Sequence, residues 1–193
     1  MRASIQKFIL CSTFFLHFLI THDVIAQNLA VEVGEKDINL VYGTTEVYGY
    51  TTPFRLDSQF LYSKQNNHQD LFASIGLTAF NSITNRIELG AGFRIIAADP
   101  LDYYLSAITI GAELAYRPAT TPKFKFKSSL YYAGELLTFS DGNAISLLKV
   151  DMDYEVVADT FIRLGYRRIK TEHTNGITAD FDRGAYLGLA WTY

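Results

Sequence analysis

Residues 147–157, LLKVDMDYEVV, show the most regular alternation of side chains in the sequence. Their apolar and charged side chains alternate one by one, which is the period of a β-strand with two unlike faces. One face carries Leu148, Val150, Met152, Tyr154 and Val156. The other face carries Lys149, Asp151, Asp153 and Glu155. The stretch therefore predicts a strand that separates an apolar environment from a polar one.

The same period recurs along most of the chain. Further alternating segments of strand length lie at 54–63, 71–79, 87–95, 104–116, 124–132, 162–167 and 186–193. With 147–157 they predict about eight strands, near the roughly 9–11 residues that a tilted membrane strand needs. LAVEVG and INLVYG, within 27–53, predict an extra hairpin if they pair. The prediction is an all-β fold, an antiparallel up-and-down transmembrane β-barrel of eight strands, or of ten if this hairpin joins.

The first residues have the composition of a secretory signal. Arg2 and Lys7 precede the apolar run FILCSTFFLHFLI, and small residues offer a cleavage site after Ala26. The run is shorter than the roughly 20 residues that a membrane-spanning helix needs. We expect a signal peptide at 1–26, an N-terminal segment with the possible hairpin at 27–53, and the barrel at 54–193. Because the single cysteine, Cys11, lies in the signal, the exported chain is expected to have no disulfide.

Alternation alone does not say which face points outward. A soluble barrel has an apolar interior, whereas a membrane barrel has an apolar exterior and a polar lumen. Small residues recur on the polar face, as a crowded lumen requires: Gly76, Gly90, Gly92, Gly111, Gly165 and Gly188. Aromatic residues gather near the strand ends of the apolar face, as in interfacial girdles: Tyr104, Tyr116, Phe124, Tyr132, Tyr154, Trp191 and Tyr193. Both features favour the membrane barrel, and a soluble periplasmic ligand-binding barrel is the alternative.

The polar face collects charges of both signs. The candidate lumen network consists of Arg55, Asp57, Glu88, Arg94, Glu113, Arg117, Lys149, Asp151, Asp153, Arg163 and Arg167, with Lys125, Lys127 and Glu155 on the same face. The interior of a barrel of about eight strands is just wide enough for side chains. We therefore expect a salt-bridge network that plugs the lumen and makes the protein structural. A weakly porin-like protein, with these charges as a selectivity lining, is the other interpretation.

Counting strands back from the C-terminus predicts which connections face outward. Both ends of such a barrel lie in the periplasm, and its outer loops are longer than its periplasmic turns. On this count 171–183 and 134–144, the two longest connections, are outer loops.

The C-terminal half resembles a known family. The segments SLYYAGELLTF (129–139), LLKVDMDYEVVADTFIRLGYRRIKTE (147–172) and TADFDRGAYLGLAWTY (178–193) are similar to the YfaZ family of small Gram-negative outer-membrane proteins. The resemblance implies an outer-membrane β-barrel of undefined activity. The last strand also resembles the signal that the barrel-assembly machinery reads, with its marked places at Gly188, Trp191 and Tyr193. We expect this machinery, outer-membrane lipid and lipopolysaccharide as partners of a monomer.

No catalytic or metal site is predicted. The segment EHTNG (172–176) superficially resembles the histidine and serine segment of lipid A deacylases, but Asn175 stands where the nucleophilic serine belongs. We expect His173 to be an exposed loop residue, and we expect no cofactor and no metal. A lipid A-modifying enzyme stays open as an alternative function. The net charge of −3 gives no reason to expect a nucleic-acid partner.

Overall fold

The structure is a computed structural model that describes residues 27–44, 53–65, 68–99, 104–174 and 176–193. The predicted signal peptide and its cleavage site lie outside the described residues. Within the described part of the chain, no helix is long and apolar enough to cross a membrane.

Nearly all of the described residues are in β-strands. The strands are β1 (Gln27–Gly34), β2 (Asp37–Thr44), β3 (Phe54–Gln65), β4 (His68–Thr84), β5 (Ile87–Asp99), β6 (Leu105–Tyr116), β7 (Phe124–Ala133), β8 (Thr138–Ser140), β9 (Gly142–Val157), β10 (Thr160–His173) and β11 (Thr178–Thr192). One short 3₁₀ helix, η2 (Glu135–Leu137), lies between β7 and β8.

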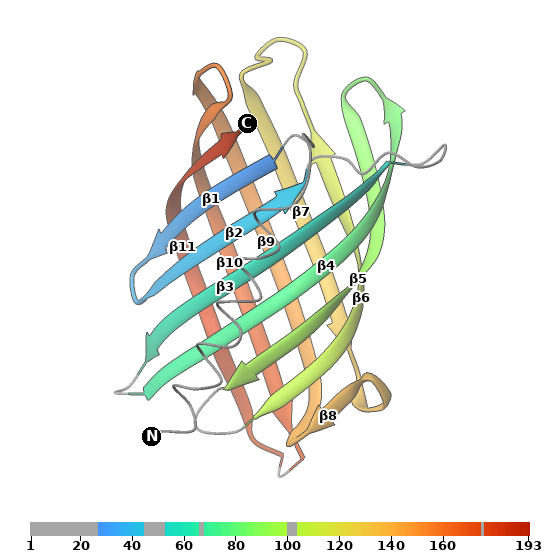
Figure 1. The fold of residues 1–193 in the computed structure, drawn as a ribbon, viewed down its shortest axis with the longest axis vertical. Coiled ribbons are helices and arrows are strands. Elements are labelled where there is room, and N and C mark those ends of the chain that lie inside the picture. Colours follow the sequence, from blue (N-terminus) through green and yellow to red (C-terminus); the bar gives the residue numbers. More distant parts are fainter. Residues whose placement is uncertain (1–26, 45–52, 66–67, 100–103, 175) are drawn as a thin grey trace.

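Ten of these strands close into an antiparallel barrel. Neighbours in the chain pair in order from β1 to β7, β7 pairs with β9, and β9, β10 and β11 follow. The barrel closes where β11 pairs with β1 (Figure 1). At this seam the amide N of Gln27 donates to the carbonyl O of Tyr193 at 2.7 Å, and the amide N of Tyr193 donates back at 2.9 Å. The hairpin of β1 and β2 therefore joins the barrel, and the ten-strand form of the prediction is confirmed.

The short strand β8 lies outside the ten-strand ring. β7 pairs with the part of β6 from Ile110 to Tyr116, and β8 pairs with the remaining part, from Leu105 to Ala107. The chain thus leaves β7, makes the turn of η2 and returns to pair with the lower end of β6. In Figure 1 this segment lies at the lower end of the barrel, while β11 ends at the upper end. We use "upper" and "lower" in this sense below.

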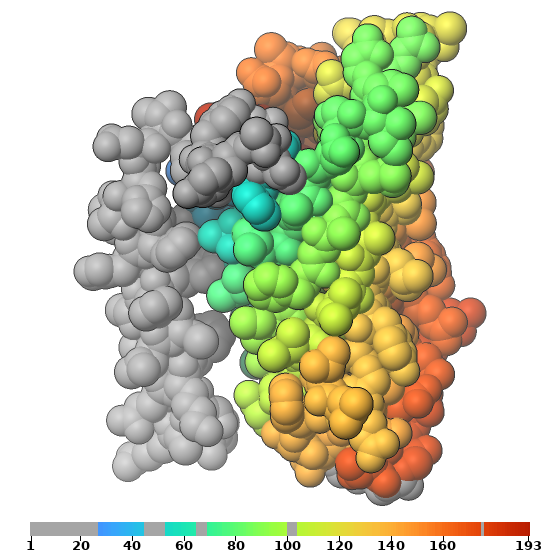
Figure 2. Space-filling model, turned by 90° about the vertical axis from the view of Figure 1, so that its right-hand side faces the viewer, coloured from blue at the N-terminus to red at the C-terminus, as the bar shows by residue number. Residues whose placement is uncertain are grey.

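The outward face of the barrel wall is apolar. Large aliphatic side chains stand exposed on nine of the ten barrel strands, with Ile110 at 63% and Leu187 at 59% exposure. The others of this kind include Ile75, Ile95, Leu130, Ile162 and Leu164. Figure 2 shows one side of this wall, where β4 to β7 form a continuous surface. An apolar exterior around a polar interior is the arrangement of a membrane barrel and the reverse of a soluble one.

The apolar band ends toward the lower end of β10 and β11. Tyr166 is the last large apolar residue on the outward face of β10, and Arg168 and Lys170 follow it on that face. Arg168 forms an ion pair of 3.1 Å with Asp180 on β11. The lower end of these strands therefore extends past the apolar band into a polar layer.

The predicted outer loop at 171–183 is wrong in extent. β10 continues to His173 and β11 already begins at Thr178, so most of the segment is paired strand. The polar residues that suggested a loop include buried ones, because a strand in a barrel carries polar side chains on its inward face. His173, expected to be exposed, is 2% exposed and is the last residue of β10.

Candidate functional site: the lumen

The lumen holds a charged cluster built around β10. Arg163 and Arg167 project inward from this strand, and both reach Glu32 on β1, at 2.9 Å and 3.0 Å. Lys149 on β9 contacts the same carboxylate at 2.7 Å, and the side-chain amide of Asn39 on β2 donates to it at 2.7 Å. Glu32 is fully buried. Four donors therefore compensate the removal of one carboxylate from water.

The two arginines also bind carboxylates of their own. Arg163 makes a bidentate pair with Asp153, at 2.7 Å and 3.0 Å. Arg167 binds Asp37 on β2 at 2.5 Å and Asp182 on β11. Each guanidinium thus uses several of its N–H groups in a fixed planar geometry, which a lysine does not offer. We call the group the β10 cluster; it consists of Glu32, Asp37, Lys127, Lys149, Asp151, Asp153, Arg163, Arg167 and Asp182.

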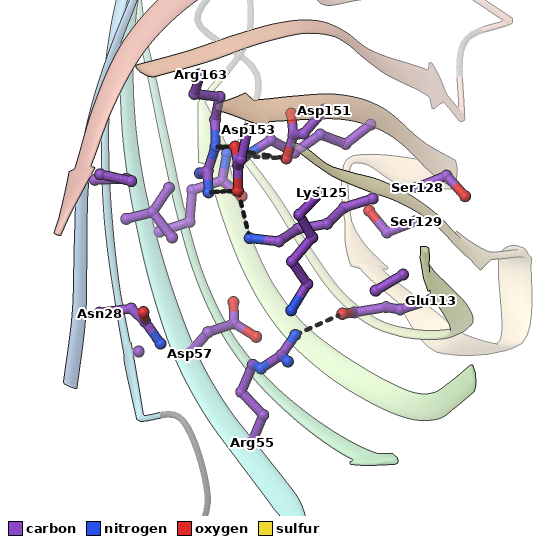
Figure 3. A pocket seen from close by; sticks show the side chains of 18 of the residues that line it. Asn28, Arg55, Asp57, Glu113, Lys125, Ser128, Ser129, Asp151, Asp153 and Arg163 are labelled. Carbon is purple, nitrogen blue, oxygen red and sulfur yellow. Dashed lines mark hydrogen bonds and ion pairs between the residues drawn. The ribbon is translucent and has the colours of Figure 1, made fainter. Parts of the chain in front are cut away.

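A second cluster lies on the opposite side of the ring, around β5. Arg94 binds Asp57 on β3 at 2.7 Å and donates to the hydroxyl of Ser74 at 2.9 Å. Glu113 on β6 accepts hydrogen bonds from Tyr131 at 2.6 Å and from Thr78 at 3.2 Å. Arg55 reaches Glu113 at 3.5 Å (Figure 3). We call this group the β5 cluster; it consists of Arg55, Asp57, Ser74, Thr78, Arg94, Glu113 and Tyr131.

Glycines allow the charged partners to meet across a whole strand. The register aligns Asp57 on β3, Gly76 on β4 and Arg94 on β5 in one row. A Cβ atom on Gly76 would lie 2.9 Å from a carboxylate oxygen of Asp57 and 3.0 Å from Nη2 of Arg94. The ion pair therefore occupies the space that a side chain at position 76 would fill.

The β10 cluster repeats this device. Glu32 on β1, Gly188 on β11 and Arg163 on β10 form one row of the register. A Cβ atom on Gly188 would lie 2.8 Å from the carbonyl oxygen of Val31 and 3.1 Å from Cγ of Glu32. Gly188 thus leaves room for an ion pair across the seam strand.

Two tyrosines cross glycines in the same way. The Tyr186 hydroxyl on β11 donates to Asp151 on β9 across Gly165 of β10. Tyr131 on β7 reaches Thr78 on β4, at 2.8 Å, across Gly111 and Gly92. The glycines that the sequence placed on the polar face therefore mark where large side chains lie flat over the inner wall.

An apolar plug fills the lower part of the lumen. Phe72 on β4 and Phe181 on β11 meet with ring centroids 5.8 Å apart, although three strands separate them along the ring. Both rings are buried, at 0% and 1% exposure. The plug consists of Leu61, Phe72, Ile96, Ala98, Leu105, Ala107, Tyr131, Ala133, Ile145, Leu147, Ile169 and Phe181. It brings together inward-facing side chains from β3 to β7 and from β9 to β11.

A β-bulge supplies one of these two rings. Ile169 pairs with Asp182, but the next residue, Lys170, pairs with Asp180, so Phe181 has no partner in the ladder. Two successive side chains of β11, Phe181 and Asp182, are consequently both buried. The bulge sends one to the plug and the other to Arg167.

Above the plug the lumen contains a cavity of about 400 Å³. Side chains of both charged clusters line it, and Asn28, Asp159 and Thr192 line its upper end. Figure 3 shows Arg55, from β3, and Lys125, from β7, pointing toward each other into this space, with Arg163 lying against Asp153. We call this cavity the chamber. The apolar plug lies below it, and charged side chains line its walls.

The structure brings most of the predicted network residues into contact. Arg55, Asp57, Arg94 and Glu113 belong to the β5 cluster, and Lys149, Asp151, Asp153, Arg163 and Arg167 belong to the β10 cluster. Glu88 lies near the upper end and pairs with Lys125 at 3.6 Å. Arg117 lines the cavity there and has no ion pair among the described residues.

Three carboxylates of the β10 cluster were not predicted. Glu32 alternates with Val31 and Val33 in LAVEVG, so its inward position was readable once that segment was accepted as a strand. Asp37 starts the partner strand of the same hairpin. Asp182 has no such signal, because the bulge breaks the alternation of β11 just before it.

The family model described as "YfaZ precursor" matches residues 7–193. The chain belongs to the YfaZ family. This confirms the resemblance found in the C-terminal half and extends it over the N-terminal hairpin. The YfaZ-family chain is an outer-membrane β-barrel, with the apolar exterior and polar interior of that class.

No curated protein matches the chain. Among solved structures it is similar to the outer membrane channel DcaP of Acinetobacter baumannii, with 9% identity and a TM-score of 0.44. That match covers 88% of this chain, and this chain spans 62% of the length of the channel. A second similar structure comes from work on the in-meso crystallization of membrane proteins, with 9% identity, a TM-score of 0.40, and coverage of 87% and 83%.

Proposed function

We propose that this YfaZ-family barrel is a structural protein of the outer membrane that does not conduct solutes. The observation that carries the proposal is the contact of Phe72 with Phe181 within the apolar plug. Ions cross membranes only along polar or hydrated paths, and a packed apolar layer offers neither. The charged clusters above it stiffen the walls of the chamber.

Closure by an apolar plug differs from the expected closure by a salt-bridge network. The ion pairs at the level of the cavity connect neighbouring or nearby strands, and about 400 Å³ stays unfilled between them. The side chains that meet between the walls are apolar. Closure is therefore assigned to the plug, and the salt bridges are assigned to the stability of the barrel.

Conductance in planar bilayers tests the proposal. We expect purified full-length protein to insert without discrete current steps at any applied voltage that the bilayer tolerates. Reproducible steps that scale with protein concentration would overturn the closed lumen and support the weakly porin-like interpretation. A general porin inserted under the same conditions is the positive control.

We further propose that the upper end faces the periplasm. The outward faces of β10 and β11 become charged at their lower ends, at Arg168, Lys170 and Arg183. A polar layer that contains several cations suits contact with the phosphates of lipopolysaccharide, which we propose as a partner along with outer-membrane lipid. The orientation is also that of a barrel whose two ends lie in the periplasm.

Cysteine labelling tests this orientation. Leu136 in η2 is 93% exposed at the lower end, and Thr120 is exposed at the upper end. In intact cells, a membrane-impermeant maleimide is expected to label Leu136→Cys and to leave Thr120→Cys unlabelled until the outer membrane is permeabilised. The opposite pattern would reverse the proposed orientation.

The proposal includes no enzymatic activity. His173, the residue considered for lipid A hydrolysis, is buried at the lower end of the lumen, with Nε2 3.3 Å from the hydroxyl of Thr171. Its ring thus lies inside the barrel, away from the outward face that meets lipid. Mass spectrometry of lipid A from deletion and overexpression strains is expected to show one unchanged acylation pattern, and a change that depends on His173 would support the enzyme.

A further inference from the structure

Two cations at the upper end of the lumen, Arg55 and Lys125, lie farther from their nearest carboxylates than the cations below them do. In the lower part of the cavity wall, Arg94, Arg163 and Arg167 each hold a carboxylate at 3.0 Å or less. At the upper end, Arg55 lies 3.5 Å from Glu113, and Lys125 lies 3.6 Å from Glu88. The cations near the upper opening of the cavity are therefore the least tightly paired with carboxylates.

The acceptors at this level are also shared. Glu113 already accepts hydrogen bonds from Tyr131 and Thr78, so only part of its capacity serves Arg55. The Glu88 side chain is 41% exposed, which weakens its pair with Lys125 by solvent screening. Asp159 lines the cavity on the side of β9 and β10.

Three cations share this place. Arg55, Arg117 and Lys125 all line the cavity, and Arg117 and Lys125 also line a smaller hollow together with Glu88. Figure 3 shows the Lys125 side chain directed toward Arg55. The guanidinium of Arg55 also stacks over Phe80, 4.1 Å from the ring centroid, which holds it in place. Cations of like charge that stay close together favour an anion between them.

We propose that the upper part of the chamber binds small solutes that carry two negative charges. Arg55, Arg117 and Lys125 supply the binding charges, and the cavity of about 400 Å³ accepts a molecule of the size of a dicarboxylate or a sugar phosphate. A dianion has enough acceptor oxygens to engage two guanidinium groups and one ammonium group. Because the plug closes the chamber below, the solute enters and leaves by the same end. The site goes beyond the proposed closed barrel, and it rests on that proposal only for this blind end.

Isothermal titration calorimetry of the full-length protein in detergent micelles tests the site. The probes are disodium succinate and inorganic phosphate at low salt, with glucose as the neutral control. We expect saturable binding of one or both anions and none of glucose. Binding to succinate alone would restrict the site to carboxylates, and binding to phosphate alone would restrict it to phosphates. Flat isotherms for both anions would overturn the proposal.

Matched variants separate the site from general surface charge. Lys125→Gln and Arg117→Gln are each expected to weaken anion binding about tenfold, the effect of losing one charge-assisted hydrogen bond. Lys123→Gln removes the same charge from the neighbouring turn, outside the cavity lining, and is expected to leave affinity unchanged. Equal losses in all three variants would overturn the proposal.

A gain of binding completes the test. Glu88→Gln removes the acid that competes for Lys125 and is expected to strengthen anion binding. The variant barrels are checked for folding by their heat-dependent mobility on gels. Conductance is a separate measurement, so a conducting barrel that binds anions would overturn only the closed lumen, and a silent barrel that binds none would overturn only this site.

Discussion

Asp57 and Arg94 form an ion pair of 2.7 Å although an entire strand, β4, runs between their own strands. The glycine at position 76 makes this possible, because it leaves the inner wall bare between them. Glu32 and Arg163 meet across Gly188 in the same way. An acid, a glycine and an arginine on three successive strands thus form one unit of the inner wall.

Filling the gap at Gly76 is expected to break this unit. In Gly76→Val the branched side chain displaces Asp57 or Arg94 and leaves a charge unpaired, so we expect a loss of about 3 kcal/mol in the free energy of unfolding. Urea unfolding in lipid vesicles, followed by the fluorescence of the single Trp191, measures it. Gly184→Val is the control, because a Cβ atom there meets nothing within 4 Å. Equal stability of the two variants would contradict the role given to Gly76.

Removing Arg167 is expected to destabilise the barrel more than removing its neighbour. Arg167→Met leaves Glu32, Asp37 and Asp182 without one of their partners, at a cost of about 3–5 kcal/mol. Arg168→Met removes a partly exposed charge from the outward face and is expected to change stability by less than about 1 kcal/mol. Unfolding curves of both variants in the same vesicles provide the comparison. Similar costs would show that the β10 cluster adds little.

Opening the plug is expected to open the lumen. The double substitution Phe72→Ser and Phe181→Ser replaces the two rings that meet between the walls with small hydroxyl groups that water can hydrate. We expect current steps in planar bilayers where the wild-type protein is silent. Phe60→Ser, on the outward face of β3, is expected to stay silent. A folded double variant without steps would place the barrier elsewhere in the lumen.

The last residue is expected to matter for assembly more than for stability. Tyr193 is 65% exposed on the outward face and pairs with Gln27 through its backbone. A charge at the membrane interface costs only about 0–1 kcal/mol, so Tyr193→Asp is expected to unfold much like the wild type. Its level in the outer membrane is expected to fall several-fold, because we propose that the barrel-assembly machinery reads this strand. Tyr193→Phe is the control, and normal levels of Tyr193→Asp would count against the assembly signal.

The barrel was predictable because alternation is a local property. Leu148 and Lys149 already lie on opposite faces of β9, and the same period in seven other segments determined the class of the fold. The positions of the glycines indicated which face points inward. Gly76 and Gly165 lie on the charged face, and small residues are needed there only if that face is the crowded interior. The predicted charged residues Asp57, Arg94, Asp153 and Arg163 accordingly meet in the lumen.

The partners and the plug were not predictable in the same way. Which arginine reaches Glu32 depends on the register of β1, β11 and β10, and alternation does not determine register. The plug depends on Phe181, which points inward only because one residue of β11 is bulged. Phe72 lies on the polar face of its strand, and its contact with Phe181 can be recognised only when the opposite wall of the barrel is known.

The pairing of Gln27 with Tyr193 has a consequence for the order in which the barrel forms. These residues stand at the two ends of the described chain. Of all the strand pairings in the barrel, theirs closes the longest loop and therefore costs the most chain entropy. Until then β1 and β11 are open edges, and Glu32 is not in reach of Arg163, Arg167 and Lys149. Closure therefore joins the sheet and brings the carboxylate of Glu32 to these three cations in one event, whereas the pairs of Arg163 with Asp153 and of Arg167 with Asp182 lie within β9 to β11 and do not require it.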